Sequence, residues 1–231
     1  MSCSPLPHPS DTTLADLRLG QALSASPATL MEVFPDTSVD ASATGFVLTQ
    51  IPRKGGPILW AQDRLSRYQA GQPCLAGLGT SLPVLHAELK RPADVLWALE
   101  EGLRCTGLSG VIGEIWGDPA VLDFTATKRL ALRAEASGVP VWLIRRSCIP
   151  NLSAARERWR IAAMPSSLHP DDTQAPGRPR WRIELFRSRW RKPGVWVASY
   201  DRKANHLRLS DQFPDGSVAD HGETFGQSAV G

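Results

Sequence analysis

Residues 108–146, "LSGVIGEIWGDPAVLDFTATKRLALRAEASGVPVWLIRR", contain two apolar strands separated by an amphipathic helix. The first strand, "LSGVIGEIW", stops at "GDP". The helical stretch repeats apolar residues at helical spacing up to Gly138, a residue suited to a helix end. The second strand, "VPVWLIRR", is again almost wholly apolar. Such strands, alternating with helices, are typical of a parallel sheet covered on both faces, so the stretch predicts an α/β fold.

The same alternation precedes this stretch. Residues 30–34, "ILWAQD" and "LPVLHAEL" are predicted strands, and "RPADVLWALEEGLRC" is a predicted helix. Helical spacing places Leu96, Leu99 and Leu103 on the buried face of that helix, with Trp97 on it or beside it. The large apolar rings at strand positions are predicted to fill the core. These are Trp60, Trp142, Trp181 and Trp196.

The pattern changes after residue 147. "RERWRIAAMP", "PRWRIELFRSRW" and "GVWVASYD" alternate apolar and polar residues without an intervening helix. They predict antiparallel strands that extend one edge of the sheet. The predicted organisation is an N-terminal segment with a short helix over 1–27, one domain over 28–210 and a disordered polar tail over 211–231. The antiparallel extension is placed at about 156–201.

Composition excludes several classes. The chain has 231 residues, 42% hydrophobic and 21% charged, with a net charge of +3, which fits one medium globular domain. No apolar run approaches the ~20 residues of a membrane span, and the N-terminus does not resemble a signal peptide. A cytoplasmic protein without membrane contact is expected. The four cysteines are scattered, so no metal site, disulfide framework or cofactor is predicted.

The loop after the first strand, "PDTSVDASAT" over residues 35–44, lies where nucleotide-binding folds hold phosphate. It has neither the lysine nor the glycines that phosphate binding needs. Asp36 and Asp40 would repel a triphosphate at short range. Ser42 and Thr44 are better explained as helix-capping residues than as magnesium ligands. The sequence therefore predicts a loop that connects a strand to a helix and does not hydrolyse nucleotide.

Two acids close predicted strands at the edge where α/β folds place their chemistry. Asp63 ends "ILWAQD" and Glu114 lies in "VIGEI". Without a phosphate-binding loop these carboxylates have no substrate, so salt bridging is the preferred interpretation. The candidate partners are Arg64, Arg67, Arg145 and Arg146.

Residues 176–194, "PGRPRWRIELFRSRWRKPG", form the most basic stretch of the chain. Strand alternation places Arg180 and Arg182 on one face and gives Arg187, Arg189 and Arg191 a common face after a change of face. This change predicts a bulge near Leu185 and Phe186. Arginine beside tryptophan suits a protein-binding hot spot, a nucleic-acid groove or a solvated sheet edge, and a protein partner is favoured. The candidate contact residues are Arg180, Arg182, Arg187, Arg189, Arg191, Lys192 and Trp190.

The order of elements resembles the RecA recombinase core. It resembles more closely the ImuA family, RecA-related accessory proteins of inducible (SOS) mutagenesis. The segments that carry this resemblance are "ILWAQDRL", "ADVLWALEEGLRC", "LDFTATKRLALRAEASGVPVWLIRR", "AARERWRIAAMPS" and "PRWRIELFRSRWRKPGVW". The resemblance implies a RecA-like core, a mostly parallel sheet flanked by helices, extended by C-terminal antiparallel strands.

The resemblance also implies a role in translesion DNA synthesis after DNA damage. The implied partners are an ImuB-like homologue of Y-family polymerases, an ImuC-type error-prone polymerase subunit and RecA, with weak direct DNA contact. In the recombinase pattern Asp63 corresponds to the water-activating glutamate and Glu114 to the magnesium-associated aspartate. Arg146 replaces a polar residue that senses nucleotide. Arg187 and Arg189 match a lysine pair that reaches the nucleotide of a neighbouring subunit.

The sequence leaves three functions open. A non-catalytic accessory protein is favoured because the phosphate-binding residues of the loop are missing. A divergent DNA-dependent ATPase of the RecA family is the second. A SulA-like cell-division inhibitor is the third, and the long arginine-rich C-terminal half argues against it.

Overall fold

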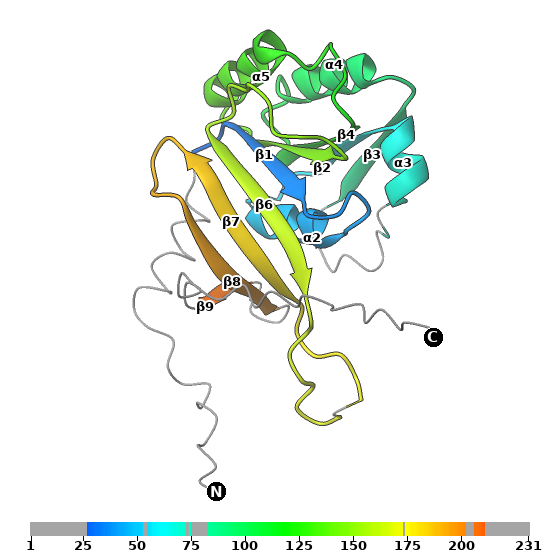
Figure 1. The fold of residues 1–231 in the computed structure, drawn as a ribbon. Coiled ribbons are helices and arrows are strands. Elements are labelled where there is room, and N and C mark those ends of the chain that lie inside the picture. Colours follow the sequence, from blue (N-terminus) through cyan, green and yellow to red (C-terminus); the bar gives the residue numbers. More distant parts are fainter. Residues whose placement is uncertain are drawn as a thin grey trace, which may run out of the picture.

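The computed structural model describes residues 27–52, 55–72, 74, 83–172, 174–201 and 206–210. One sheet of nine strands in the order β3-β2-β4-β5-β1-β6-β7-β8-β9 organises this part of the chain (Figure 1). The strands are β1 (Leu30–Pro35), β2 (Ile58–Asp63), β3 (Val84–Leu89), β4 (Gly110–Trp116), β5 (Val141–Arg146), β6 (Glu157–Met164), β7 (Arg180–Ser188), β8 (Gly194–Asp201) and β9 (His206–Ser210). The helices are α2 (Ser42–Gln50), α3 (Arg64–Ala70), α4 (Pro92–Gly102) and α5 (Phe124–Ser137).

The first six strands in the sheet order pair in parallel, and β1 lies between β5 and β6. These strands are β3, β2, β4, β5, β1 and β6. The prediction that every strand after residue 147 is antiparallel is therefore wrong for β6. Residues 147–156 carry the chain past β1, so β6 enters beside β1 in the same direction. The turn from β6 into β7 then reverses the chain, and β7, β8 and β9 are antiparallel as predicted.

The predicted bulge is confirmed in β7. Arg158 pairs with Arg187 and Trp159 pairs with Leu185, so Phe186 is the extra residue. Directly paired residues of neighbouring strands share a face of the sheet. The bulge therefore turns Arg187 to the face of Arg158, opposite to the buried face of Leu185.

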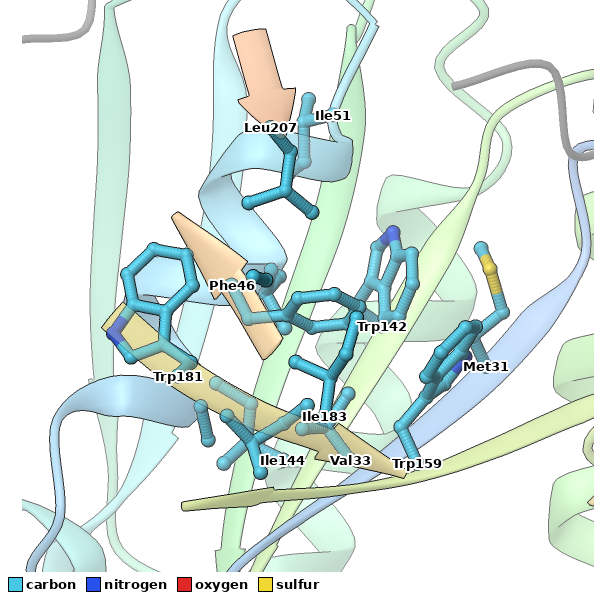
Figure 2. Close-up of a cluster of buried hydrophobic side chains, with 14 of the residues drawn as sticks. Met31, Val33, Phe46, Ile51, Trp142, Ile144, Trp159, Trp181, Ile183 and Leu207 are labelled. Carbon is cyan, nitrogen blue, oxygen red and sulfur yellow. The ribbon is translucent and has the colours of Figure 1, made fainter. Parts of the chain in front are cut away.

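Helices cover the two faces of the sheet unequally. α4 and α5 lie on one face of the parallel half, and the short α2 lies on the other (Figure 1). α2 packs Phe46 among the rings of Trp142 and Trp159, with centroids 6.0 and 5.3 Å away (Figure 2). A Cβ on Gly45 would lie 2.8 Å from the Trp181 ring, so glycine allows this close approach.

The helix and core predictions are mostly confirmed. Leu96, Leu99 and Leu103 are buried, as are the four tryptophans predicted for the core. Trp97 is different: it is 65% exposed, because it lies on the outer side of α4. Asp123 caps α5 by accepting a hydrogen bond from the Ala126 N–H, and Gly138 ends it with a left-handed φ of 71°.

Two elements are absent from the sequence prediction. α3 is only seven residues long and shows little helical periodicity. β9 follows the predicted end of the antiparallel extension and pairs with β8. The predicted helix within 1–27 and the predicted disordered tail over 211–231 lie outside the described residues.

Candidate functional site

The loop between β1 and α2, at the position of a phosphate-binding loop, holds a guanidinium group. Arg146, the last residue of β5, donates from Nη1 to the carbonyl oxygens of Ser38 and Asp40 at 2.9 and 3.0 Å. Its Nη2 donates to Thr44 Oγ1 at 3.2 Å. Arg146 is only 3% exposed. An internal cation therefore closes the position where a nucleotide fold would receive an anion.

The polarity of this loop is the reverse of a phosphate cradle. A phosphate loop presents backbone N–H groups to an anion, whereas this loop presents oxygen atoms to Arg146. The Asp40 carboxylate accepts from the Ser42 N–H at 2.7 Å and from Ser42 Oγ at 2.6 Å. The predicted capping role of Ser42 and Thr44 is wrong, because Ala41 is the N-cap of α2 and no side chain caps it. It also accepts from the Ala163 N–H of β6 at 3.0 Å. These bonds hold the loop against the sheet.

Glu114 neutralises Arg146, one of the four arginines that the sequence offered as its partners. Its Oε2 accepts from Arg146 Nε at 3.1 Å and from Gln62 Nε2 at 3.1 Å. Its Oε1 accepts from Trp60 Nε1 at 3.2 Å. His86 adjoins Gln62, and burial, followed by the charge of Arg67, lowers the pKa of its imidazole. Both Glu114 oxygens are thus occupied by groups of the protein itself.

Asp63 does not follow the salt-bridge prediction. It caps α3 by accepting from the Ser66 N–H at 2.7 Å and accepts from the Trp116 N–H at 3.1 Å. Within the described part of the chain it forms no ion pair, and Arg67 instead pairs with Glu88 at 3.6 Å. A carboxylate at a strand end serves the first turn of the following helix when that helix starts immediately.

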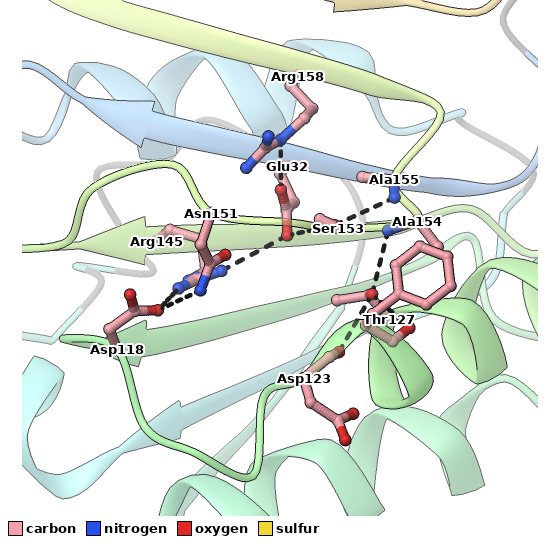
Figure 3. Close-up of polar contacts among 11 residues, drawn as sticks. Glu32, Asp118, Asp123, Thr127, Arg145, Asn151, Ser153, Ala154, Ala155 and Arg158 are labelled. Carbon is pink, nitrogen blue, oxygen red and sulfur yellow. Dashed lines mark hydrogen bonds and ion pairs between the residues drawn. The ribbon is translucent and has the colours of Figure 1, made fainter.

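A second buried charge cluster lies on the opposite face of the sheet, around Glu32 of β1 (Figure 3). Glu32 is fully buried and accepts from Arg158 Nε at 2.7 Å and from Ser153 Oγ at 2.9 Å. Arg145 Nη1 lies 3.6 Å from the same carboxylate, and Arg145 Nη2 donates to Asp118 at 2.6 Å. The predicted pairing of Arg145 with Asp63 or Glu114 is therefore wrong.

Sequence reasoning missed this cluster. The signal was a glutamate in the middle of "LMEVFP", an otherwise apolar strand, since a buried carboxylate requires a partner. The partners come from β5 and β6, far away in sequence. Phe34 completes the packing, with Arg158 and Arg145 guanidinium carbons 5.2 and 5.9 Å from its ring centroid.

The basic stretch 176–194 divides into several environments. Arg187, Arg189, Trp190 and Lys192 are exposed. Arg180 and Arg182 are half-buried, and Arg182 lies 3.7 Å from Glu184.

The predicted common face of Arg187, Arg189 and Arg191 is wrong. Arg191 turns inward to Glu157 at 3.0 Å, with only 16% of its side chain exposed. Burial raises the pKa of the Glu157 carboxyl, and Arg191 opposes that shift. Because β7 ends at Ser188, the alternation of a strand no longer applies beyond it.

Neither a metal cluster nor a membrane-spanning helix is found in the described ranges. No three His, Cys, Asp or Glu side chains gather there as metal ligands would. No helix among those residues has the length and apolar character to cross a membrane. The buried carboxylates Glu114 and Glu32 each bind an arginine side chain.

A related sequence and a related structure show which family and which fold this chain has. No family model matches the chain. Protein ImuA of Caulobacter vibrioides, in strains NA1000 and ATCC 19089, is 35% identical to it over 75% of both chains. The chain belongs to the ImuA family. The crystal structure of the RadB recombinase superposes with a TM-score of 0.52 at 11% identity, covering 80% of this chain and 92% of that one. The predicted RecA-like fold is therefore confirmed.

In this ImuA-family chain the predicted vestigial nucleotide positions do not form one cluster. Thr44, Glu114 and Arg146 are in direct contact, and Ser42 joins them through Asp40. The exposed Asp36 donates its backbone N–H to the Ile161 carbonyl of β6 at 2.8 Å. Asp63 lies at the start of α3. The part of the predicted site that is assembled is an internal ion pair with a loop wrapped around it.

Proposed function

We propose that this ImuA-family protein is a non-catalytic accessory protein of error-prone translesion DNA synthesis in the DNA-damage (SOS) response. The observation that carries the proposal is the Arg146 guanidinium inside the loop between β1 and α2. Membership of the ImuA family supports the process, and the occupied loop supports the absence of catalysis.

Binding a triphosphate would have to displace Arg146. Its departure would leave the Glu114 carboxylate, 1% exposed, without its counter-charge. Breaking one side of a buried ion pair typically costs about 3–5 kcal/mol. The nucleotide would gain no lysine and no glycine-rich cradle in exchange, and Asp40 would face its phosphates. The loop therefore favours its own arginine over an anionic ligand.

Because the proposed role is not catalytic, the protein is proposed to act by binding other proteins. The proposed partners are an ImuB-like polymerase homologue, an ImuC-type error-prone polymerase subunit and RecA. The exposed cations and tryptophan at the end of β7 are the residue types enriched in binding hot spots. They are Arg187, Arg189, Lys192 and Trp190. Direct DNA binding by this protein is proposed to be weak.

Calorimetric titration with ATP and magnesium tests the non-catalytic part. Wild-type protein is expected to give no saturable heat, and Arg146→Ala is expected to give none either, because emptying the loop does not create phosphate donors. Arg104→Ala, at an exposed ion pair with Glu101, is the matched control. A sub-millimolar dissociation constant for wild-type protein, or steady phosphate release, would overturn this part.

A genetic measurement tests the role itself. In the source organism, deletion of the gene is expected to reduce the frequency of mutations induced by ultraviolet light, and the wild-type gene is expected to restore it. An unchanged induced mutation frequency in the deletion strain would overturn the proposed process. The two measurements fail separately, so catalysis and biological role are judged independently.

A further inference from the structure

A surface hollow of about 390 Å³ lies between α5, residues 153–156 and the end of β7. Phe124 and Leu132 of α5 contribute apolar side chains that are 43% and 49% exposed. Lys128 lies between them on the same side of the helix, because residues four apart form one stripe. The basic side chains of its lining are Lys128, Arg156, Arg187 and Arg189.

Three exposed cations of this hollow, Lys128, Arg187 and Arg189, form no ion pair within 4 Å among the described residues. Arg189 still lies near enough to Glu135 for its charge to help lower the pKa of that carboxyl. Other arginines nearby are neutralised: Arg156 binds Glu135 at 2.7 Å, and Arg129 binds Glu100 at 3.0 Å. The hollow therefore combines apolar side chains with an excess of exposed positive charge.

The backbone around the hollow is held in place. The Arg189 N–H donates to the Arg156 carbonyl at 3.0 Å. The Ala154 N–H donates to Thr127 Oγ1 of α5 at 3.1 Å, and Ser153 is bonded to the buried Glu32. The β7 bulge at Phe186 turns Arg187 to this face. A site whose walls are already ordered loses little conformational entropy on binding.

We propose that this hollow binds an acidic segment of a partner protein that inserts an apolar side chain between Phe124 and Leu132. Aspartates or glutamates beside that side chain pair with Lys128, Arg187 and Arg189. This inference rests on the proposed function, since it assigns a surface and a ligand chemistry to an accessory protein.

A protein segment fits this hollow better than a nucleic-acid strand. A strand needs a groove of cations that follows successive phosphates. Here the cations lie around one compact depression, and one of them, Arg156, is paired with Glu135 of α5.

Fluorescence anisotropy with the full chain tests the proposal. The probes are the fluorescein-labelled peptide DDLFDDL, its neutral analogue NNLFNNL, its apolar-free analogue DDSSDDS and labelled dT12. DDLFDDL is expected to bind saturably, with a dissociation constant below about 1 mM. Both analogues are expected to bind about tenfold more weakly, because each removes one of the two interactions that the hollow offers.

Variants locate the binding. Arg187→Glu with Arg189→Glu is expected to weaken DDLFDDL binding about tenfold or more, and Phe124→Ser by a similar factor. Lys90→Glu, an exposed cation at the end of β3, is the matched control and is expected to have no effect. Circular dichroism confirms that each variant is folded.

Two results would overturn the proposal. One is the absence of saturable DDLFDDL binding, or binding that is unaffected by both hollow variants. The other is dT12 binding that is tighter than peptide binding and is lost with the same arginines, which would assign the hollow to nucleic acid. Neither result bears on the fall in induced mutation frequency expected for the deletion strain, so the proposed function would stand.

Discussion

Two buried charge clusters lie back to back on the same sheet, and consecutive residues of β5 create them. Arg146 faces α2 and binds Glu114, whereas Arg145 faces α5 and lies beside Glu32. Side chains alternate along a strand, so neighbouring arginines serve opposite faces. Both clusters have a glutamate at 1% exposure or less, but they neutralise it differently.

The difference lies in the kind of partner. Around Arg146 most partners are neutral: two loop carbonyls and Thr44 on the arginine, Trp60 and Gln62 on Glu114. Around Glu32 most partners are charged, and several donors have no acceptor among the described residues. These donors are Arg145 Nε, Arg145 Nη1 and Arg158 Nη2. A cluster of neutral hydrogen bonds should tolerate the loss of one charge better than a cluster of charges.

The largest effect is expected from Glu32→Ala. It leaves Arg158 buried without its carboxylate and removes one of the two acids beside Arg145. The free energy of unfolding should fall by about 5 kcal/mol, the upper end for a broken buried ion pair. Urea unfolding followed by tryptophan fluorescence measures it.

A matched surface change controls for charge removal alone. Glu88→Ala deletes a partly exposed carboxylate paired with Arg67 and should cost about 0.5 kcal/mol or less. If Glu32→Ala lowers the free energy of unfolding no more than Glu88→Ala does, the charge cluster around Glu32 does not stabilise the fold in the way its burial implies.

A smaller effect is expected from Glu114→Ala. Arg146 keeps the Ser38 and Asp40 carbonyls as acceptors, so the cost should be about 3 kcal/mol, the lower end of the same range. The same urea experiment compares it directly with Glu32→Ala. A larger loss for Glu114→Ala than for Glu32→Ala would reverse the ranking of the two clusters.

The smallest effects are expected from pH, and they have opposite signs at two glutamates. A hydrogen bond from Arg156 lowers the pKa of Glu135, whereas burial raises the pKa of Glu157. The stabilisation from Glu135 is present above its unfolded pKa and is lost as pH falls through its folded pKa. The contribution of Glu157 is present below its unfolded pKa and is lost as pH rises through its folded pKa.

Glutamine substitutions measure how the contribution of each glutamate to the free energy of unfolding changes with pH. The loss of unfolding free energy caused by Glu135→Gln should shrink as pH falls below about 4.5, the ordinary value for both carboxyls. The loss caused by Glu157→Gln should shrink as pH rises above about 4.5. Parallel pH profiles for the two variants would contradict the assigned causes.

The predicted part of the fold consists of elements with strong local patterns. α5 has a capping Asp123 and a terminating Gly138, and β5 begins with four consecutive apolar residues, 141–144. The bulge was visible because the basic residues of β7 change face at Phe186. α3 and β9 were missed because they are short, and Trp97 was misplaced because its position lies at the border of the helical stripe.

The candidate site was predicted in its chemistry but not in all its pairings. The absence of phosphate-binding residues and the salt bridging of Glu114 came from composition and strand ends, whereas the choice of Arg146 among four candidate arginines came from the structure. The capping role of Asp63 depended on a helix starting at the next residue. The inward turn of Arg191 depended on the buried Glu157, which no local pattern of the basic stretch indicates.

The sequence by itself determined the α/β class, the loss of a phosphate cradle and the charges at the carboxyl ends of the strands, because these follow from local periodicity and residue type. Only the tertiary structure decided which arginine meets which acid. β1 lies between β5 and β6, and this strand order brings Glu32 to Arg145 and Arg158 across more than a hundred residues. Long-range pairing depends on strand order, and strand order depends on the packing of the whole sheet.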